Sequence, residues 1–63
     1  MSRLSYKDVE GLVNEVKGFG VNLQLQYGNG VYALNGAVNK GFRSSAEIYN
    51  FLDGMVTVLR KMR

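Results

Sequence analysis

The sequence contains no cysteine and no histidine among its 63 residues. These absences exclude disulfide bonds, thiolate nucleophiles and nearly every structural zinc site. A chain of this length buries only about 60% of the surface that its unfolded form exposes. Small domains therefore usually gain extra stability from a disulfide, a metal or a partner subunit. For this chain, any extra stability would have to come from self-association.

Long apolar runs are also lacking, since no stretch approaches the roughly 18 residues that a membrane span requires. The opening residues, MSRLSYKD, lack the apolar core of a signal peptide. The absence of cysteine fits a reducing compartment, so we expect a cytoplasmic protein with no membrane partner. The net charge of +3, from eight basic and five acidic residues, does not by itself indicate nucleic-acid binding.

A helix is predicted over residues 5–18. Ser5 and Asp8 have the spacing of a capping box, with Asp8 in place of the usual Glu or Gln. Gly18 or Gly20 ends the helix, because glycine adopts the left-handed cap conformation at little cost. Apolar residues recur at helical spacing, at Val9, Leu12, Val13 and Val16.

Strands are predicted over residues 21–27 and 31–35, on either side of the dipeptide Asn29-Gly30. This dipeptide favours a type I′ turn, which would place Tyr27 opposite Tyr32. A turn at Gly28-Asn29 is the alternative, and it would shift the partners but keep the same two faces. The apolar face comprises Leu23, Leu25, Tyr27, Tyr32 and Leu34. The other face comprises Asn22, Gln24, Gln26, Val31 and Ala33.

A second helix is predicted over residues 45–62, where Ser44 and Glu47 form a capping box. Its apolar residues are Ile48, Phe51, Leu52, Met55, Val56, Leu59 and Met62. Residues 36–43 are predicted as a loop, and a short third strand at Ala37–Val38 is the alternative.

These elements predict one α+β domain over residues 1–63, in the order helix, strand, strand, helix. The two amphipathic helices are expected to pack side by side on the apolar face of the antiparallel hairpin, which makes two layers. A two-stranded hairpin is at best marginally stable alone in water, so it needs this cover.

The second helix carries more apolar surface than this arrangement covers. From Val58 round to Tyr49, its apolar arc spans about 180°, against a little over 100° for a one-sided helix. Val58 and Tyr49 are either ordinary exposed apolar residues or part of a second contact surface, most simply that of a symmetric dimer.

The hairpin supports self-association because its edges carry no proline, charge or evident bulge. Pairing through the strand Val31–Asn35 would make a four-stranded sheet across a dimer. The candidate dimer contacts are Val31, Ala33, Tyr49 and Val58.

Two glycines lie inside the predicted helices. Gly11 and Gly54 each destabilise a helix interior by up to about 1 kcal/mol relative to alanine. They mark places where another chain approaches closely, or they are tolerated without a function.

Catalysis is not expected from these residues. The acids are Asp8, Glu10, Glu15, Glu47 and Asp53. Asp8 and Glu47 fit capping roles, and no two acids are placed to face each other as general acid and base. Ser44 and Ser45 have no histidine to activate them. We therefore predict no enzyme, no catalytic residue, no cofactor and no metal.

The segment NKGFRSS is the strongest candidate for a binding site. Lys40 and Arg43 precede a helix N-terminus, whose free N–H groups attract anions, and Phe42 could stack on a base. These three residues are candidate contacts to a partner or a phosphate. The alternative is a solvated loop with Phe42 packed beneath it and Ser44 capping the helix.

The order helix–strand–strand–helix, with room for a third strand, resembles that of double-stranded-RNA-binding domains. In that family, a basic cluster at the second helix grips phosphates. Only Lys40 and Arg43 could stand in for it here, because the family's consecutive lysines inside the helix are missing. The resemblance implies a small nucleic-acid-binding domain as an alternative function.

A second resemblance covers most of the chain. The hairpin YGNGVYAL, the basic loop and the helix RSSAEIYNFLDGM resemble small uncharacterised proteins encoded by bacteriophages. This resemblance implies a non-enzymatic accessory protein that modulates a host or defence component by binding a macromolecular surface. It nominates no active residue, and the protein partner is unknown.

Overall fold

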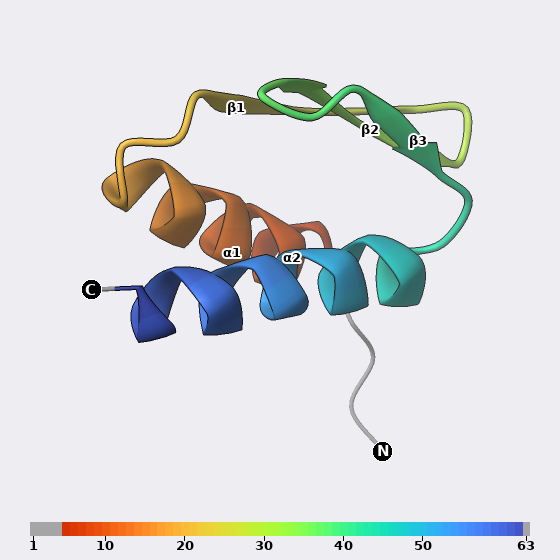
Figure 1. The fold of residues 1–63 in the computed structure, drawn as a ribbon. Helices are drawn as coiled ribbons and strands as arrows, with labels where there is room; N and C mark the ends of the chain where they lie inside the picture. Colours follow the sequence, from red (N-terminus) through yellow and green to blue (C-terminus); the bar gives the residue numbers. More distant parts are fainter. Residues whose placement is uncertain (1–4, 63) are drawn as a thin grey trace.

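The structure is a computed structural model that describes residues 5–62. Its elements are α1 (Tyr6–Gly18), β1 (Leu23–Gly28), β2 (Val31–Gly36), β3 (Lys40–Phe42) and α2 (Ser45–Lys61). The strands form one antiparallel sheet in the order β1-β2-β3. Both helices lie on the same side of this sheet (Figure 1). The α+β class and the two-layer arrangement are therefore confirmed.

The hairpin between β1 and β2 has the register that the Asn29-Gly30 turn predicts. Tyr27 lies opposite Tyr32, and Leu25 lies opposite Leu34. Asn29 and Gly30 have φ angles of 54° and 73°, which is the pair of positive angles that a type I′ turn requires. The alternative turn at Gly28-Asn29 is wrong.

The connection after β2 differs from the prediction, because residues 36–43 are not all loop. The chain reverses at Gly36, which has a φ of 120°. The side chain of Asn39 closes this reversal, since it accepts from the Gly36 N–H at 3.4 Å and donates to the Gly36 carbonyl at 3.3 Å. The third strand proposed at Ala37–Val38 is therefore misplaced: those residues form the turn, and β3 follows them.

The position of β3 also corrects the predicted dimer edge. Because β2 lies between β1 and β3, its two edges are already paired within the chain. The strand Val31–Asn35 cannot join two copies through its edge. The free edges of the described sheet belong to β1 and β3, so a sheet continued across a dimer would have to use one of these.

Both helices begin with the predicted capping interactions. The Asp8 carboxylate accepts from the backbone N–H of Ser5 at 2.8 Å. In α2, the Ser44 hydroxyl accepts from the Glu47 N–H at 3.2 Å, and the Glu47 carboxylate accepts from the Arg43 N–H at 3.1 Å. Each start is thus fixed by side chains that satisfy N–H groups without a partner in the helix.

The core lies between the sheet and the two helices. Its buried members, each no more than 7% exposed, are Val9, Val13, Val16, Leu23, Tyr32, Leu34, Phe42, Ile48, Leu52 and Val56. Every element contributes to this cluster, so the two layers stabilise each other. Neither α1 nor α2 is long and apolar enough to cross a membrane.

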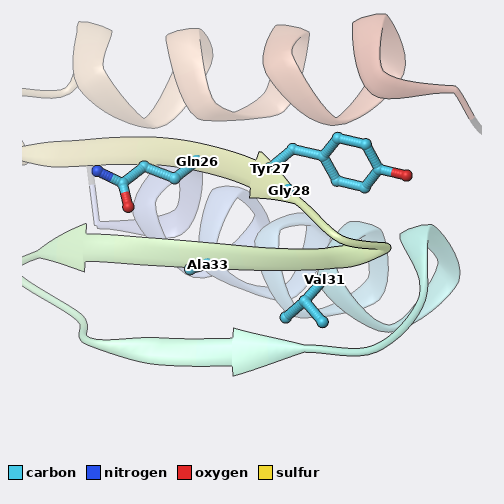
Figure 2. A pocket seen from close by; sticks show the side chains of 5 residues that line it. All are labelled: Gln26, Tyr27, Gly28, Val31 and Ala33. Carbon is cyan, nitrogen blue, oxygen red and sulfur yellow. The ribbon is translucent and has the colours of Figure 1, made fainter.

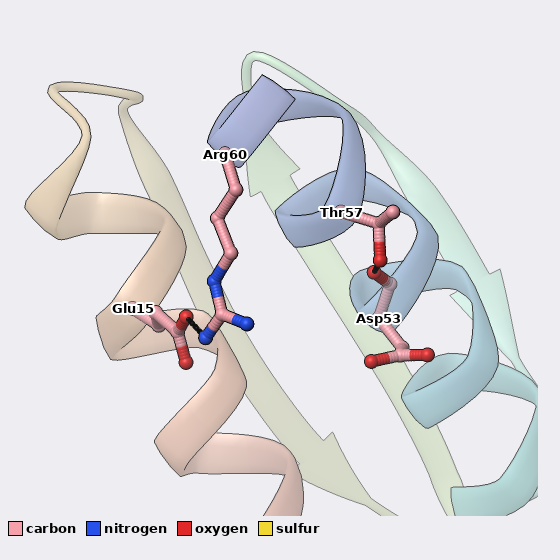
Figure 3. Close-up of polar contacts among 4 residues, drawn as sticks. All are labelled: Glu15, Asp53, Thr57 and Arg60. Carbon is pink, nitrogen blue, oxygen red and sulfur yellow. Dashed lines mark hydrogen bonds and ion pairs between the residues drawn. The ribbon is translucent and has the colours of Figure 1, made fainter. Parts of the chain in front are cut away.

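The two helices also touch outside the core. Arg60 of α2 forms an ion pair with Glu15 of α1 (Figure 3). Because the Arg60 side chain is 66% exposed, this pair contributes little stability. It does identify the side of α2 that faces α1.

Candidate interaction surface

The face of the sheet opposite the helices is uncovered in the part of the chain that the structure describes. Side chains alternate between the two faces of a strand, so this face takes every second residue. Its members are Gln24, Gln26, Gly28, Val31, Ala33, Asn35 and Gly41, which we call the open face. Figure 2 shows the sheet with several of these side chains, and α2 lies behind it.

The turn end of the β1–β2 hairpin carries a wide depression of about 450 Å³ on the open face. It is lined by Gln26, Tyr27, Gly28, Val31 and Ala33 (Figure 2). Gln26 and Ala33 are direct cross-strand partners, and Gly28 pairs with Val31. Because glycine and alanine have little or no side chain, the backbone here is accessible to a flat surface.

The chemistry of the open face is neutral and polar. No charged residue occurs between Gly18 and Lys40. The side-chain amides of Gln24 and Gln26 have no hydrogen-bond partner within residues 5–62. Each amide can both donate and accept. The face therefore offers hydrogen-bonding groups and small apolar contacts, and it carries no nucleophile.

A cluster of aromatic rings lies behind the turn end of the hairpin, on the helix side of the sheet. The Tyr27 ring lies 4.5 Å from the Tyr32 ring and 6.1 Å from the ring of Tyr6 in α1, between centroids. Tyr27 remains 55% exposed although it belongs to the predicted apolar face. Its ring therefore lies on the helix side of the sheet, and Tyr27 borders the depression only from the end of β1.

The predicted phosphate site does not present its three residues together. Phe42 is 4% exposed and packs against Phe51, with ring centroids 5.3 Å apart, so it cannot stack on a base. The Lys40 ammonium lies 5.3 Å from the centroid of each of these rings, in a cation–π contact. This arrangement matches the alternative in which Phe42 is packed beneath the segment and Ser44 caps the helix.

The N-terminus of α2 is already occupied by groups of this chain. The Glu47 carboxylate holds the Arg43 N–H, and the Ser44 hydroxyl holds the Glu47 N–H. A carboxylate at this position repels a phosphate. Where the resembling family has lysines, α2 opens with Ser45, Ala46 and Glu47.

A second depression of about 410 Å³ lies beside this segment, and sequence reasoning did not identify it. It is lined by Lys40, Gly41, Phe42, Glu47, Asn50 and Phe51. From the sequence, the apolar spacing of the second helix indicated only that Phe51 faces the core. It did not indicate that Phe51 lies beside Lys40.

The four candidate dimer contacts lie on separate surfaces. Val31 and Ala33 are on the open face. Tyr49 and Arg60 are eleven residues apart and share one side of α2 at about 100° per residue, so Tyr49 faces α1. Val58 lies on the opposite side of the helix and is 56% exposed. The structure thus separates the four into three groups.

The two helix glycines face open space. A methyl group added at Gly11 or Gly54 would meet no heavy atom within 4 Å. Neither glycine is therefore required by packing within the described residues. Among those residues, the acidic side chains also form no group of three that could hold a metal ion.

Comparison of the chain with family models, with curated proteins and with solved structures found no match.

Proposed function

We propose that this protein is a non-enzymatic interaction protein that binds the surface of another macromolecule through its open face. The observation that carries the proposal is a central strand, β2, that is covered by helices on one side and bare on the other. The solvated face of an antiparallel sheet is usually polar, and this one has amides, small residues and a valine but no charged side chain. Protein interfaces are depleted of charge at their centres.

The partner that this face fits best is a protein with a flat, largely neutral surface. Gln24 and Gln26 would hydrogen-bond to its backbone or polar side chains. Val31 and Ala33 would supply the apolar contact. The resemblance to phage proteins extends the proposal to an accessory protein that binds a host or defence component in the cytoplasm.

The alternative function, nucleic-acid binding through Lys40 and Arg43, has less support. Phe42 is buried, and Glu47 occupies the helix N-terminus. A backbone binder with several phosphate contacts would lose about 10³-fold or more in affinity between 50 and 200 mM salt. Titration of mixed-sequence DNA and RNA at these two salt concentrations therefore separates the two functions.

The proposal is tested by comparing what the wild-type chain and two matched variants retain from a bacterial host lysate. Ala33→Arg places a cation at the centre of the open face, while Asn14→Arg places the same charge on the exposed side of α1. With Ala33→Arg, we expect the amount of retained host protein to fall at least about tenfold, because an unpaired charge buried in an interface is strongly unfavourable. The second variant should retain it.

Equal retention by both variants would show that binding uses another surface. Retained material that disappears on nuclease treatment would favour the nucleic-acid alternative. Circular dichroism of both variants is the check that the fold is intact.

A further inference from the structure

One flank of α2 carries an apolar stripe that the other helix of the described chain does not cover, although Phe51 within it packs against Phe42 of β3. Its members are Phe51, Met55, Val58 and Met62, which we call the outer flank. Val58 is 56% exposed and Met62 is 77% exposed, while the other two are half-buried. At 100° per residue, all four lie within about 60° of each other around the helix.

The outer flank faces away from the rest of the helix layer. Arg60 marks the side of α2 that contacts α1, through its ion pair with Glu15 (Figure 3). Val58 and Arg60 are separated by about 200° around the helix axis. The outer flank therefore has no helix beside it, although α1 covers the opposite side.

The spacing within the outer flank suits another helix. Its residues are separated by four, three and four positions, which is the a/d pattern of a coiled-coil seam. Such a seam is completed by a helix that packs alongside at about 20°. The described chain offers only α1 and α2, which already pack against each other. A helix that completed this seam would therefore belong to another molecule.

A second row of residues, next to the outer flank, indicates which helix would pack against it. Glu47, Gly54 and Lys61 are seven residues apart, so they follow the seam along the same side, and all three are exposed. If two α2 helices pack antiparallel, Glu47 of one copy lies near Lys61 of the other. A parallel arrangement would instead place like charges together. The row is thus self-complementary about a two-fold axis at Gly54.

The empty space at Gly54 has a use in this arrangement. A methyl group there meets nothing within 4 Å, and a glycine in a helix interior destabilises the helix. At the crossing point of two helices, the missing side chain allows the backbones to approach closely. Around this point, Phe51 of one copy would pack against Val58 of the other.

We propose that the outer flank of α2 binds the same flank of a second copy, which makes a symmetric antiparallel dimer. The interface is isologous, as in most homodimers. It leaves the open face uncovered, so the dimer would present two copies of that face. Four apolar side chains per copy make a small interface, and we expect it to dissociate on dilution.

Sedimentation equilibrium of the full chain is the first measurement. The average mass should rise from 7.0 kDa toward twice that value between about 10 µM and about 1 mM protein. Val58→Glu should raise the dissociation constant at least about tenfold, because it places a charge in the seam. Ala33→Arg, on the open face, should leave the constant unchanged. A mass of 7.0 kDa at every concentration overturns the proposal.

Cysteine cross-linking then locates the interface. Because the chain has no cysteine, a single introduced thiol can pair only with its copy in another molecule. Gly54→Cys, near the two-fold axis, should form a covalent dimer on mild oxidation much faster than Asn14→Cys on α1. Equal rates in a protein that does dimerise would place the interface elsewhere, and would equally overturn the proposal.

Discussion

The two faces of the sheet are made by alternate residues of the same strands, yet they differ in burial and in chemistry. On the helix-covered face, Leu23 and Leu34 are fully buried. On the open face, Gln24 and Gln26 are exposed and Val31 is 44% exposed. The first face is required for folding, because it forms the core with both helices. The second face makes no contact with the helices, so the protein could fold equally well with charged residues on it.

This difference separates residues that hold the fold from residues that are free to serve a partner. A solvated surface with no partner gains solubility from charged residues such as lysine or glutamate. The open face has neither, although charged residues occupy both helices. Folding therefore does not account for this composition, and the proposed binding surface would.

The largest effect in this comparison is expected from Leu34→Ala. Removing a fully buried leucine should lower the free energy of unfolding by about 3 kcal/mol, a large part of the total of about 3–9 kcal/mol for a domain of this size. Gln24→Ala, on the opposite face, should change it by no more than about 0.5 kcal/mol. Urea denaturation followed by circular dichroism measures both. Similar losses for the two variants would mean that the faces are not distinct.

A smaller effect is expected where the sheet reverses direction. Gly36→Ala should destabilise the protein by about 2 kcal/mol, because residues with a side chain rarely adopt a positive φ. The added methyl would also collide with the Asn22 carbonyl, whose carbon lies 3.1 Å away. Gly28→Ala is the matched control, since its methyl would meet nothing within 4 Å on the open face. Thermal unfolding of both variants should separate them, and equal midpoints would contradict the role of Gly36.

The smallest effect extends the comparison to the exposed side of the helix layer. Gly11→Ala should stabilise the protein by about 0.5–1 kcal/mol, because alanine is the better helix former and the space is open. In dilute solution, Gly54→Ala should give a similar gain. Chemical denaturation of each variant gives the value. A lower free energy of unfolding for Gly11→Ala would indicate a close neighbour at that position. It would then contradict the distinction between covered and uncovered surfaces.

Much of the fold was predictable because its determinants are local. Asn29-Gly30 and the period-two pattern around it specify the turn, the register and the two faces. Ser44 and Glu47 specify where α2 begins. These signals act within a few residues, so they can be read without knowledge of the tertiary structure.

The third strand was not predictable in the same way. Lys40, Gly41 and Phe42 do not form an alternating apolar pattern. Their pairing with β2 depends on the backbone angle of Gly36 and on the two hydrogen bonds of Asn39. The same limit applies to the candidate site, because the sequence does not distinguish an exposed Phe42 from a buried one. The sequence showed that the second helix has more apolar residues than one face needs. It did not show which of them α1 covers and which form the outer flank.

The connection between β3 and α2 is only two residues long, and Glu47 reaches back across it to the Arg43 N–H. This link has a consequence for the order in which the molecule opens. Unravelling the first turn of α2 breaks the bond from Glu47 to Arg43, the residue that directly follows β3, and detaching β3 pulls on the same bond. Under hydrogen–deuterium exchange, the amides of the two elements would be expected to lose protection together, as one cooperative unit.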